Sequence, residues 1–119
     1  MLVDDELPLL QLVERYLTRL GFEVEPHSTS QNALRNFEAA PARYDLVIAD
    51  LGMPDVPGDA LLTSMLQRRP QLVALICSGS EFFPSTLPAG VRDRVGFLQK
   101  PFVPKMLAEA IERLLAQRK

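Results

Sequence analysis

Residues 45–54 read DLVIADLGMP, and they are the most informative stretch of this chain. The apolar run at 46–49 is continuous and stops at Asp50. An apolar run of this length, followed by a loop that contains Gly52 and Pro54, is typical of a strand buried on both faces. Such strands belong to parallel sheets that helices cover on both sides.

Further strands and helices are indicated on either side of this stretch. Apolar runs predict strands at 1–3, 72–77 and 95–98, and alternating residues predict another at 22–25. Residues at helical spacing predict helices that begin near Pro8, near a cap at Ser28 or Ser30, at Ala60 and at Lys105, and that end at Gly21, Pro41, Arg69 and Gln117.

The segment 81–93 should hold one more helix, but it contains Pro84, Pro88 and Gly90. A proline inside a helix costs about 3 kcal/mol. We therefore expect this helix to be short or distorted, and the segment to be more mobile than the other connections.

Strands that alternate with helices require crossover connections and hence a parallel sheet. The fold class expected is α/β, a doubly wound five-stranded parallel sheet in the flavodoxin-like order 2-1-3-4-5, with helices on both faces. At 119 residues the chain fits one domain, which we expect to span 1–119.

Polar side chains stand where the predicted strands end. Asp4 and Asp5 follow the first strand, Asp50 the third, Ser78 the fourth and Lys100 the fifth. Because strands 1 and 3 are neighbours in this order, three carboxylates should converge, and a hard cation such as Mg²⁺ would relieve their repulsion. With a lysine to pair with an anion and a hydroxyl donor, the set suits phosphoryl transfer.

Taken singly, each of these features has a simpler explanation. An acidic pair after a strand more often complements a helix N-terminus, and an aspartate that ends a strand often forms a turn. Their shared position at the strand ends favours a functional site. Two other residues with reactive side chains do not join it: we expect His27 in a surface loop and Cys77 buried in its strand.

The composition argues against a nucleic-acid-binding, membrane or disulfide-bonded protein. The net charge of −2 predicts no general attraction to nucleic acid or membrane, and a single cysteine cannot form an internal disulfide. No apolar run approaches the ~20 residues that span a bilayer. We expect a cytoplasmic protein.

Four motifs resemble the response-regulator receiver family, in order and over essentially the whole chain. They are LVDDE at 2–6, DLVIADLGMP at 45–54 with Gly58, CSG at 77–79 and FLQKPF at 97–102. The resemblance implies that Asp50 is the nucleophile and becomes an aspartyl phosphate. It implies a histidine kinase or histidine phosphotransfer protein as partner, and a monomer or weak homodimer. No catalysis is implied beyond the domain's own phosphorylation and dephosphorylation.

The same resemblance assigns the metal ligands. Asp5 would ligate Mg²⁺ directly and Asp4 largely through water, with Asp50 and the backbone carbonyl of Gly52 completing the protein ligands. The first strand has fewer apolar residues before Asp4 than the family usually shows, which is consistent with a domain cut from a longer protein.

The remaining roles concern the phosphoryl group and the switch. Ser78 and Lys100 would each bond a phosphoryl oxygen, and Phe97 matches the family's switch aromatic. The Lys100–Pro101 peptide is expected to be cis, a form found mainly before proline. The motifs at 77–79 and 97–102 are similar to those of receivers attached to hybrid sensor kinases.

Three alternative functions compete with this interpretation. A Mg²⁺-dependent phosphatase with an aspartyl intermediate would need a second acid where Gly52 stands and an inserted cap. A receiver-like binding module that is never phosphorylated would not need the intact set of strand-end residues. A flavin or dinucleotide binder would need a glycine-rich loop where Asp4 and Asp5 stand.

Overall fold

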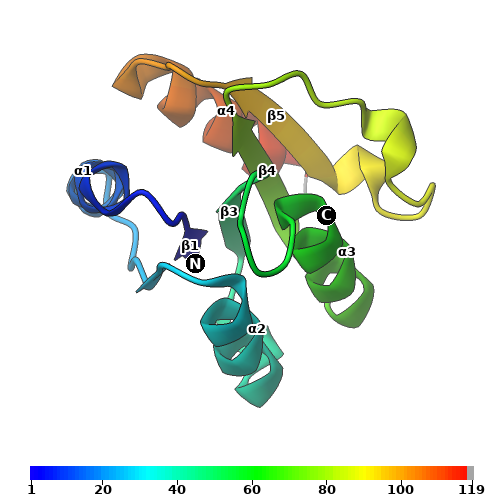
Figure 1. The fold of residues 1–119 in the computed structure, drawn as a ribbon. Coiled ribbons are helices and arrows are strands. Elements are labelled where there is room, and N and C mark those ends of the chain that lie inside the picture. The colour runs from blue at the N-terminus through cyan, green and yellow to red at the C-terminus, as the bar shows by residue number, and fades with distance from the viewer. Residues whose placement is uncertain (118–119) are drawn as a thin grey trace.

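The computed structural model describes residues 1–117; residues 118 and 119, which the expected domain span of 1–119 includes, lie outside the described part. Within residues 1–117, five strands form one parallel sheet in the order β2-β1-β3-β4-β5 (Figure 1). The strands are β1 (Leu2–Val3), β2 (Pro26–His27), β3 (Leu46–Asp50), β4 (Val73–Ser78) and β5 (Val95–Gln99). The helices are α1 (Leu7–Arg19), α2 (Ser30–Ala39), α3 (Gly58–Arg68) and α4 (Pro104–Gln117). The doubly wound α/β fold predicted from the sequence is confirmed.

Helices cover both faces of the sheet, α1 and α4 on one and α2 and α3 on the other (Figure 1). Side chains alternate along a strand, so each face has its own core. Val47 and Ala49 pack in the core beneath α2 and α3, whereas Ile48 packs in the core beneath α1 and α4. Asp50 continues the alternation of Ile48, so its side chain leaves the sheet on the α1 and α4 side.

The central strands are buried as the apolar runs predicted. Every residue of β4 is buried, and Val47 and Ala49 of β3 have no exposed surface. Cys77 is buried in β4, as expected, and burial raises the pKa of its thiol to about 12. None of the helices described here is long and apolar enough to cross a bilayer.

The second strand is displaced from its predicted position. The alternation at 22–25 predicted a strand, but β2 is Pro26–His27. In the register of the sheet Leu2 pairs with Pro26, so β1 ends short of residues 22–25, although the carbonyl of Glu25 accepts the N–H of Leu2 at 2.9 Å. A strand needs a neighbour to complete its hydrogen bonds, and the prediction was wrong for that reason.

His27 is in β2 rather than in a surface loop, which corrects a second expectation. Its Nε2 lies 2.9 Å from Oε2 of Glu25. The same carboxylate oxygen accepts a hydrogen bond from the hydroxyl of Tyr44 at 2.7 Å. His27 thus belongs to a small polar cluster at the edge of the sheet.

Helix α2 has a different cap from the two predicted. The N-cap is Thr29, whose hydroxyl oxygen accepts the backbone N–H of Asn32 at 3.2 Å, rather than Ser28 or Ser30. Ser30 is fully buried, and its hydroxyl donates to the carbonyl of Val56 at 2.7 Å. Three capping residues in a row give the sequence no means of choosing among them.

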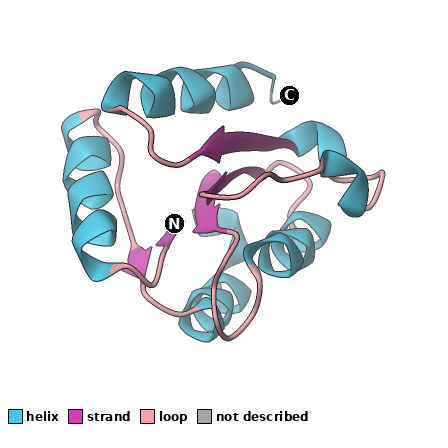
Figure 2. Cartoon of the chain, turned by 45° about the horizontal axis from the view of Figure 1, so that its top comes forward, coloured by secondary structure: helices cyan, strands magenta, loops and turns pink. Residues whose placement is uncertain are grey.

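The connection between β4 and β5 contains no α-helix. It has two single-turn 3-10 helices, Pro84–Thr86 and Arg92–Arg94, joined by loops (Figure 2). Two 3-10 turns thus stand where a short or distorted helix was expected, while the expected mobility stays a prediction. Leu87 and Val91 still fill the core from this segment. The Arg94 guanidinium holds it in place by donating to backbone carbonyls at 2.9–3.1 Å, those of Leu66, Arg69, Pro70 and Leu72.

Candidate functional site

Strands β1 and β3 bring three carboxylates together at one end of the sheet. Asp4 and Asp5 follow β1 directly, and Asp50 is the last residue of β3. Val3 pairs with Ala49, so the next residues, Asp4 and Asp50, stand at the same level. One oxygen atom from each of the three carboxylates lies within 4.8 Å of the others. The predicted convergence is present.

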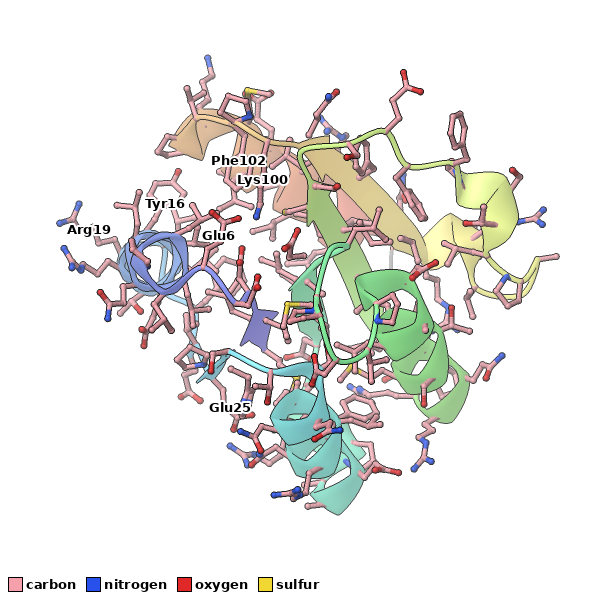
Figure 3. All side chains as sticks on the ribbon, in the orientation of Figure 1. Glu6, Tyr16, Arg19, Glu25, Lys100 and Phe102 are labelled. Carbon is pink, nitrogen blue, oxygen red and sulfur yellow. The ribbon has the colours of Figure 1, made fainter. Side chains whose placement is uncertain are left out.

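The ammonium of Lys100 lies among carboxylates that come from two different elements. Its Nζ is 3.1 Å from Oδ2 of Asp4, 3.5 Å from Oδ1 of Asp50 and 3.2 Å from Oε1 of Glu6. Figure 3 shows Lys100 and Glu6 reaching toward each other across the end of the sheet. The backbone N–H of Lys100 donates to the Ser78 carbonyl at 2.7 Å, and the peptide bond to Pro101 is cis, as predicted.

Burial and charge shift the pKa values of this group. Burial raises the pKa of the Asp4 carboxyl, and the negative charge of Asp50 adds to that effect, against hydrogen bonds from the Glu6 N–H and from Lys100. Burial alone would lower the pKa of Lys100, but hydrogen bonds and charge from Asp4, together with Asp50 and Glu6, raise it. Lys100 therefore keeps its proton at neutral pH.

The acidic group suits a hard cation. Lys100 pairs with Asp4, Asp50 and Glu6, and Asp5 lies in the same acidic group, so carboxyl groups outnumber the one ammonium here. Asp4 is buried and Asp5 is exposed, so the group opens to solvent on one side. Asp4, Asp5 and Asp50 offer only oxygen ligands, and together they can hold a metal ion.

Gly52 lies close to the carboxylate that ends β3. A Cβ atom added to Gly52 would stand 3.8 Å from Oδ2 of Asp50, so its backbone is beside that side chain. Gly58 approaches the strand more closely, since an added Cβ would lie 2.3 Å from the carbonyl oxygen of Asp50. Only glycine allows this approach, which turns the loop back over the end of β3.

Ser78 and Phe97, the two residues predicted to act as a switch, lie on the neighbouring strands. Cys77 pairs with Asp50, and Ser78 comes one residue later. The hydroxyl oxygen of Ser78, which is buried, accepts the backbone N–H of Ser80 at 3.0 Å. Phe97 is partly buried, and the centroid of its ring lies 5.9 Å from that of Phe82.

Two contacts near the site were not anticipated from the sequence. Glu6 was noted only as the end of a motif, although it shares Lys100 with Asp4. Asp55 was given no role, although it bonds to the start of α2. The sequence shows that Glu6 is acidic and follows Asp5, and that Asp55 is acidic and lies in the loop after Asp50. It does not show their partners, which lie far away in the sequence.

Residues 1–112 match the family described as "Response regulator receiver domain". The chain belongs to this family. The match covers most of the chain and includes every strand-end residue of the candidate site.

Relatives and solved structures agree with the assignment to the receiver family. The chain is 31% identical to the transcriptional regulatory protein FixJ of Rhizobium meliloti, over 94% of this chain and 54% of FixJ. It is also 31% identical to the sensor kinase CckA of Brucella abortus, over 97% of this chain and 12% of CckA. The receiver thus spans about half or less of the length of these relatives.

Among solved structures, a response regulator receiver protein from Sinorhizobium medicae has a TM-score of 0.85 at 27% identity, covering 99% of this chain and 94% of that one. A response regulator receiver domain protein from Clostridium thermocellum has a TM-score of 0.84 at 27% identity, covering 98% and 92%. Both likenesses extend over the whole receiver fold.

Proposed function

We propose that this receiver domain accepts a phosphoryl group on Asp50 from a histidine kinase or a histidine phosphotransfer protein, with Mg²⁺ as cofactor. The observation that carries the proposal is the convergence of the Asp4, Asp5 and Asp50 carboxylates beside the ammonium of Lys100. Family membership supports the same chemistry, because the family match spans residues 1–112 and these residues lie in the motifs that resemble the receiver family.

The ligands proposed for Mg²⁺ are Asp4, Asp5 and Asp50 with the backbone carbonyl of Gly52. Mg²⁺ binds through a few protein oxygens and keeps its other positions for water and phosphate oxygens, which suits a small cluster open on one side. When bound, the ion would offset the charge of the carboxylates and of an incoming phosphoryl group.

Asp50 is the proposed acceptor because it ends β3 in the acidic cluster beside a cation. Its Oδ1 lies 3.5 Å from Nζ of Lys100, and one of its carboxylate oxygens lies within 4.8 Å of an oxygen of the exposed Asp5. A carboxylate oxygen of Asp50 forms a bond to phosphorus while the bond from phosphorus to the donor's imidazole nitrogen breaks. The electron pair of the broken bond stays with the imidazole. The domain catalyses no more than its own phosphorylation and dephosphorylation.

Lys100 and Ser78 would then change partners. Lys100 already stands 3.5 Å from the acceptor carboxylate and can turn from Asp4 to a phosphoryl oxygen. The Ser78 hydroxyl can donate to another phosphoryl oxygen if it gives up the N–H of Ser80. A shift of Ser78 would let Phe97 move inward, and the surface of β5 and α4 would change shape for a partner.

The extent of the domain, its compartment and its oligomeric state form part of the same proposal. We propose that residues 1–119 make up one receiver domain, which acts in the cytoplasm as a monomer or weak homodimer without binding nucleic acid or membrane itself. The chain is equally similar to a segment of the sensor kinase CckA and to the transcriptional regulator FixJ, so attachment to a sensor kinase rests on the motifs at 77–79 and 97–102. Phosphotransfer from each histidine kinase and phosphotransfer protein of the host would identify the donor.

The proposal is tested by labelling with acetyl phosphate, a small phosphodonor. We expect labelling of the wild-type chain only with a divalent cation present, none of Asp50→Asn, and weaker Mg²⁺ binding by Asp5→Asn. Labelling without metal, or equal labelling of Asp50→Asn, would show that the acceptor is elsewhere. No labelling at all would favour a receiver-like binding module that is not phosphorylated.

A further inference from the structure

The loop that carries Gly52 is bonded to a helix of a different crossover. In this loop, residues 51–57, the carboxylate of Asp55 reaches the first turn of α2. Its Oδ1 accepts the backbone N–H of Ser30 at 3.2 Å, and its Oδ2 accepts that of Gln31 at 3.0 Å. Both oxygens of the carboxylate are thus engaged by a helix that lies 24 or 25 residues earlier in the chain.

A second hydrogen bond joins the same two segments in the opposite direction. The side chain of Ser30 is fully buried, and its hydroxyl donates to the backbone carbonyl of Val56 at 2.7 Å. A loop side chain therefore binds the helix backbone while a helix side chain binds the loop backbone. Two such links restrict both the position and the rotation of the loop relative to α2.

Charge strengthens the link made by Asp55. Slight burial would raise the pKa of its carboxyl, but the backbone N–H groups of Gln31, Ser30 and Val56 together lower it. The carboxylate also lies at the positive end of the α2 dipole. Thr29 already caps the helix by accepting the N–H of Asn32. The bonds of Asp55 therefore attach the loop to α2 as well as capping the helix.

Other anchors of the loop lie on either side of Asp55. The side chain of Met53 is buried in the core beneath α2 and α3. The N–H of Leu51 donates to the carbonyl of Cys77 at 3.0 Å, and the N–H of Gly58 donates to the carbonyl of Leu51 at 3.1 Å. Between these anchors Gly52 is exposed and stands beside the Asp50 carboxylate. Of the anchors named here, only Asp55 binds a different element through an exposed side chain.

We propose that Asp55 is a positioning residue that holds the loop against α2, so that Gly52 stays beside Asp50 in the metal site. This inference rests on the proposed function, because it takes the Gly52 carbonyl to be a metal ligand. Groups that support a ligand indirectly commonly affect metal affinity about 10- to 100-fold. Asp55 is exposed to water, so we expect a smaller effect, about three- to tenfold.

The experiment compares Asp55→Ala with Thr29→Ala in the full chain. Both variants remove hydrogen bonds from the first turn of α2, but only Asp55→Ala releases the loop. Calorimetric titration with Mg²⁺ gives the affinity, and amide exchange without metal gives the protection of Ser30, Gln31 and Gly58. We expect about three- to tenfold weaker Mg²⁺ binding and faster exchange at these amides for Asp55→Ala, and wild-type Mg²⁺ affinity for Thr29→Ala.

Two results would overturn the inference. In the first, Asp55→Ala binds Mg²⁺ with wild-type affinity although the amides of Ser30 and Gln31 exchange faster. In the second, Asp55→Ala and Thr29→Ala lose the same amount of Mg²⁺ affinity. Asp55→Asn keeps an acceptor without the charge and should bind Mg²⁺ with intermediate affinity, which covers the case in which Asp55→Ala does not fold. If wild type itself does not bind Mg²⁺, the proposed metal site fails. The metal-free exchange then still tests the link, and wild-type protection of Gly58 in Asp55→Ala would contradict it.

Discussion

Nζ of Lys100 lies 3.1 Å from Oδ2 of Asp4, and this ion pair joins the ends of the first and last strands of the chain across 96 residues. The two side chains are 15% and 9% exposed, so solvent screens them little. Lys100 is also the cation closest to Asp50 among the ion pairs of the described residues. The charge of this one side chain thus offsets part of the negative charge at the acidic end of the sheet.

Replacing Lys100 by methionine should destabilise the metal-free protein. The substitution keeps most of the side chain's apolar length but leaves the buried Asp4 carboxylate without its cation, which we expect to cost about 1–3 kcal/mol. Denaturant unfolding of Lys100→Met with and without Mg²⁺ provides the measurement. Added Mg²⁺ should recover much of the loss, and equal stability of Lys100→Met and wild type without metal would contradict this account.

Gly58→Ala should destabilise the fold because the added methyl group has no room. Its Cβ would lie 2.3 Å from the Asp50 carbonyl oxygen, so the backbone of the loop or of β3 must shift. Overpacking of this kind costs about 1–3 kcal/mol. Gly79→Ala is the matched control, since nothing lies within 4 Å of its added Cβ. A comparison of unfolding midpoints that found the two variants alike would count against the close approach.

The hydroxyl of Tyr44 should make stability depend on pH at the alkaline end. Burial and the hydrogen bond to Glu25 raise the pKa of Tyr44 from 10.0 to about 12. The folded state therefore holds the phenolic proton more tightly than the unfolded chain does. The resulting stabilisation is complete below pH 10 and is lost as the pH rises toward about 12.

Tyr44→Phe isolates this effect, because it removes the hydroxyl and keeps the ring that stacks on Phe37. The free energy of unfolding of wild type should exceed that of Tyr44→Phe by about 1 kcal/mol at neutral pH. This difference should shrink above pH 10. Denaturant unfolding of both proteins from pH 7 to pH 11 measures it. A difference that stays constant over this range would show that the Tyr44 proton is not linked to folding.

Ser78→Ala should separate phosphorylation from its structural consequence. The variant keeps Asp50 and the acidic cluster, so it should still be labelled, but it lacks the hydroxyl that is proposed to follow the phosphoryl group. NMR of the Phe97 ring with and without a beryllofluoride mimic should show a change in wild type and little change in Ser78→Ala. The same response in both proteins would mean that the coupling does not pass through Ser78.

The sequence predicted the sheet and the carboxylate cluster because both follow from one regularity. Buried parallel strands appear as continuous apolar runs, and their carboxyl ends meet at one edge, so Asp50 could be placed beside Asp4 from strand order alone. Gly52, in contrast, was named through the resemblance to the receiver family, and its backbone does lie beside the Asp50 side chain. The sheet order and the carboxylate cluster depend only on topology.

What the sequence did not reveal depends on contacts between distant residues. The strand predicted at 22–25 moved to Pro26–His27 because the extent of β1 sets which residues have a partner. Neither the Glu6 bond to Lys100 nor the Asp55 bond to α2 has a local signal, since each acid pairs across the fold. Local patterns therefore predicted where four of the five strands lie, but not which side chains link the loops between them.

The most direct test of the central claim is the chemical location of the phosphoryl group. After treatment with acetyl phosphate and Mg²⁺, borohydride converts an aspartyl phosphate to homoserine, which peptide mass spectrometry can place in the sequence. The account predicts homoserine at Asp50, only when a divalent cation was present, and unmodified Asp4 and Asp5. Homoserine at another aspartate, or a phosphoryl group on a serine or histidine with Asp50 unmodified, would contradict it.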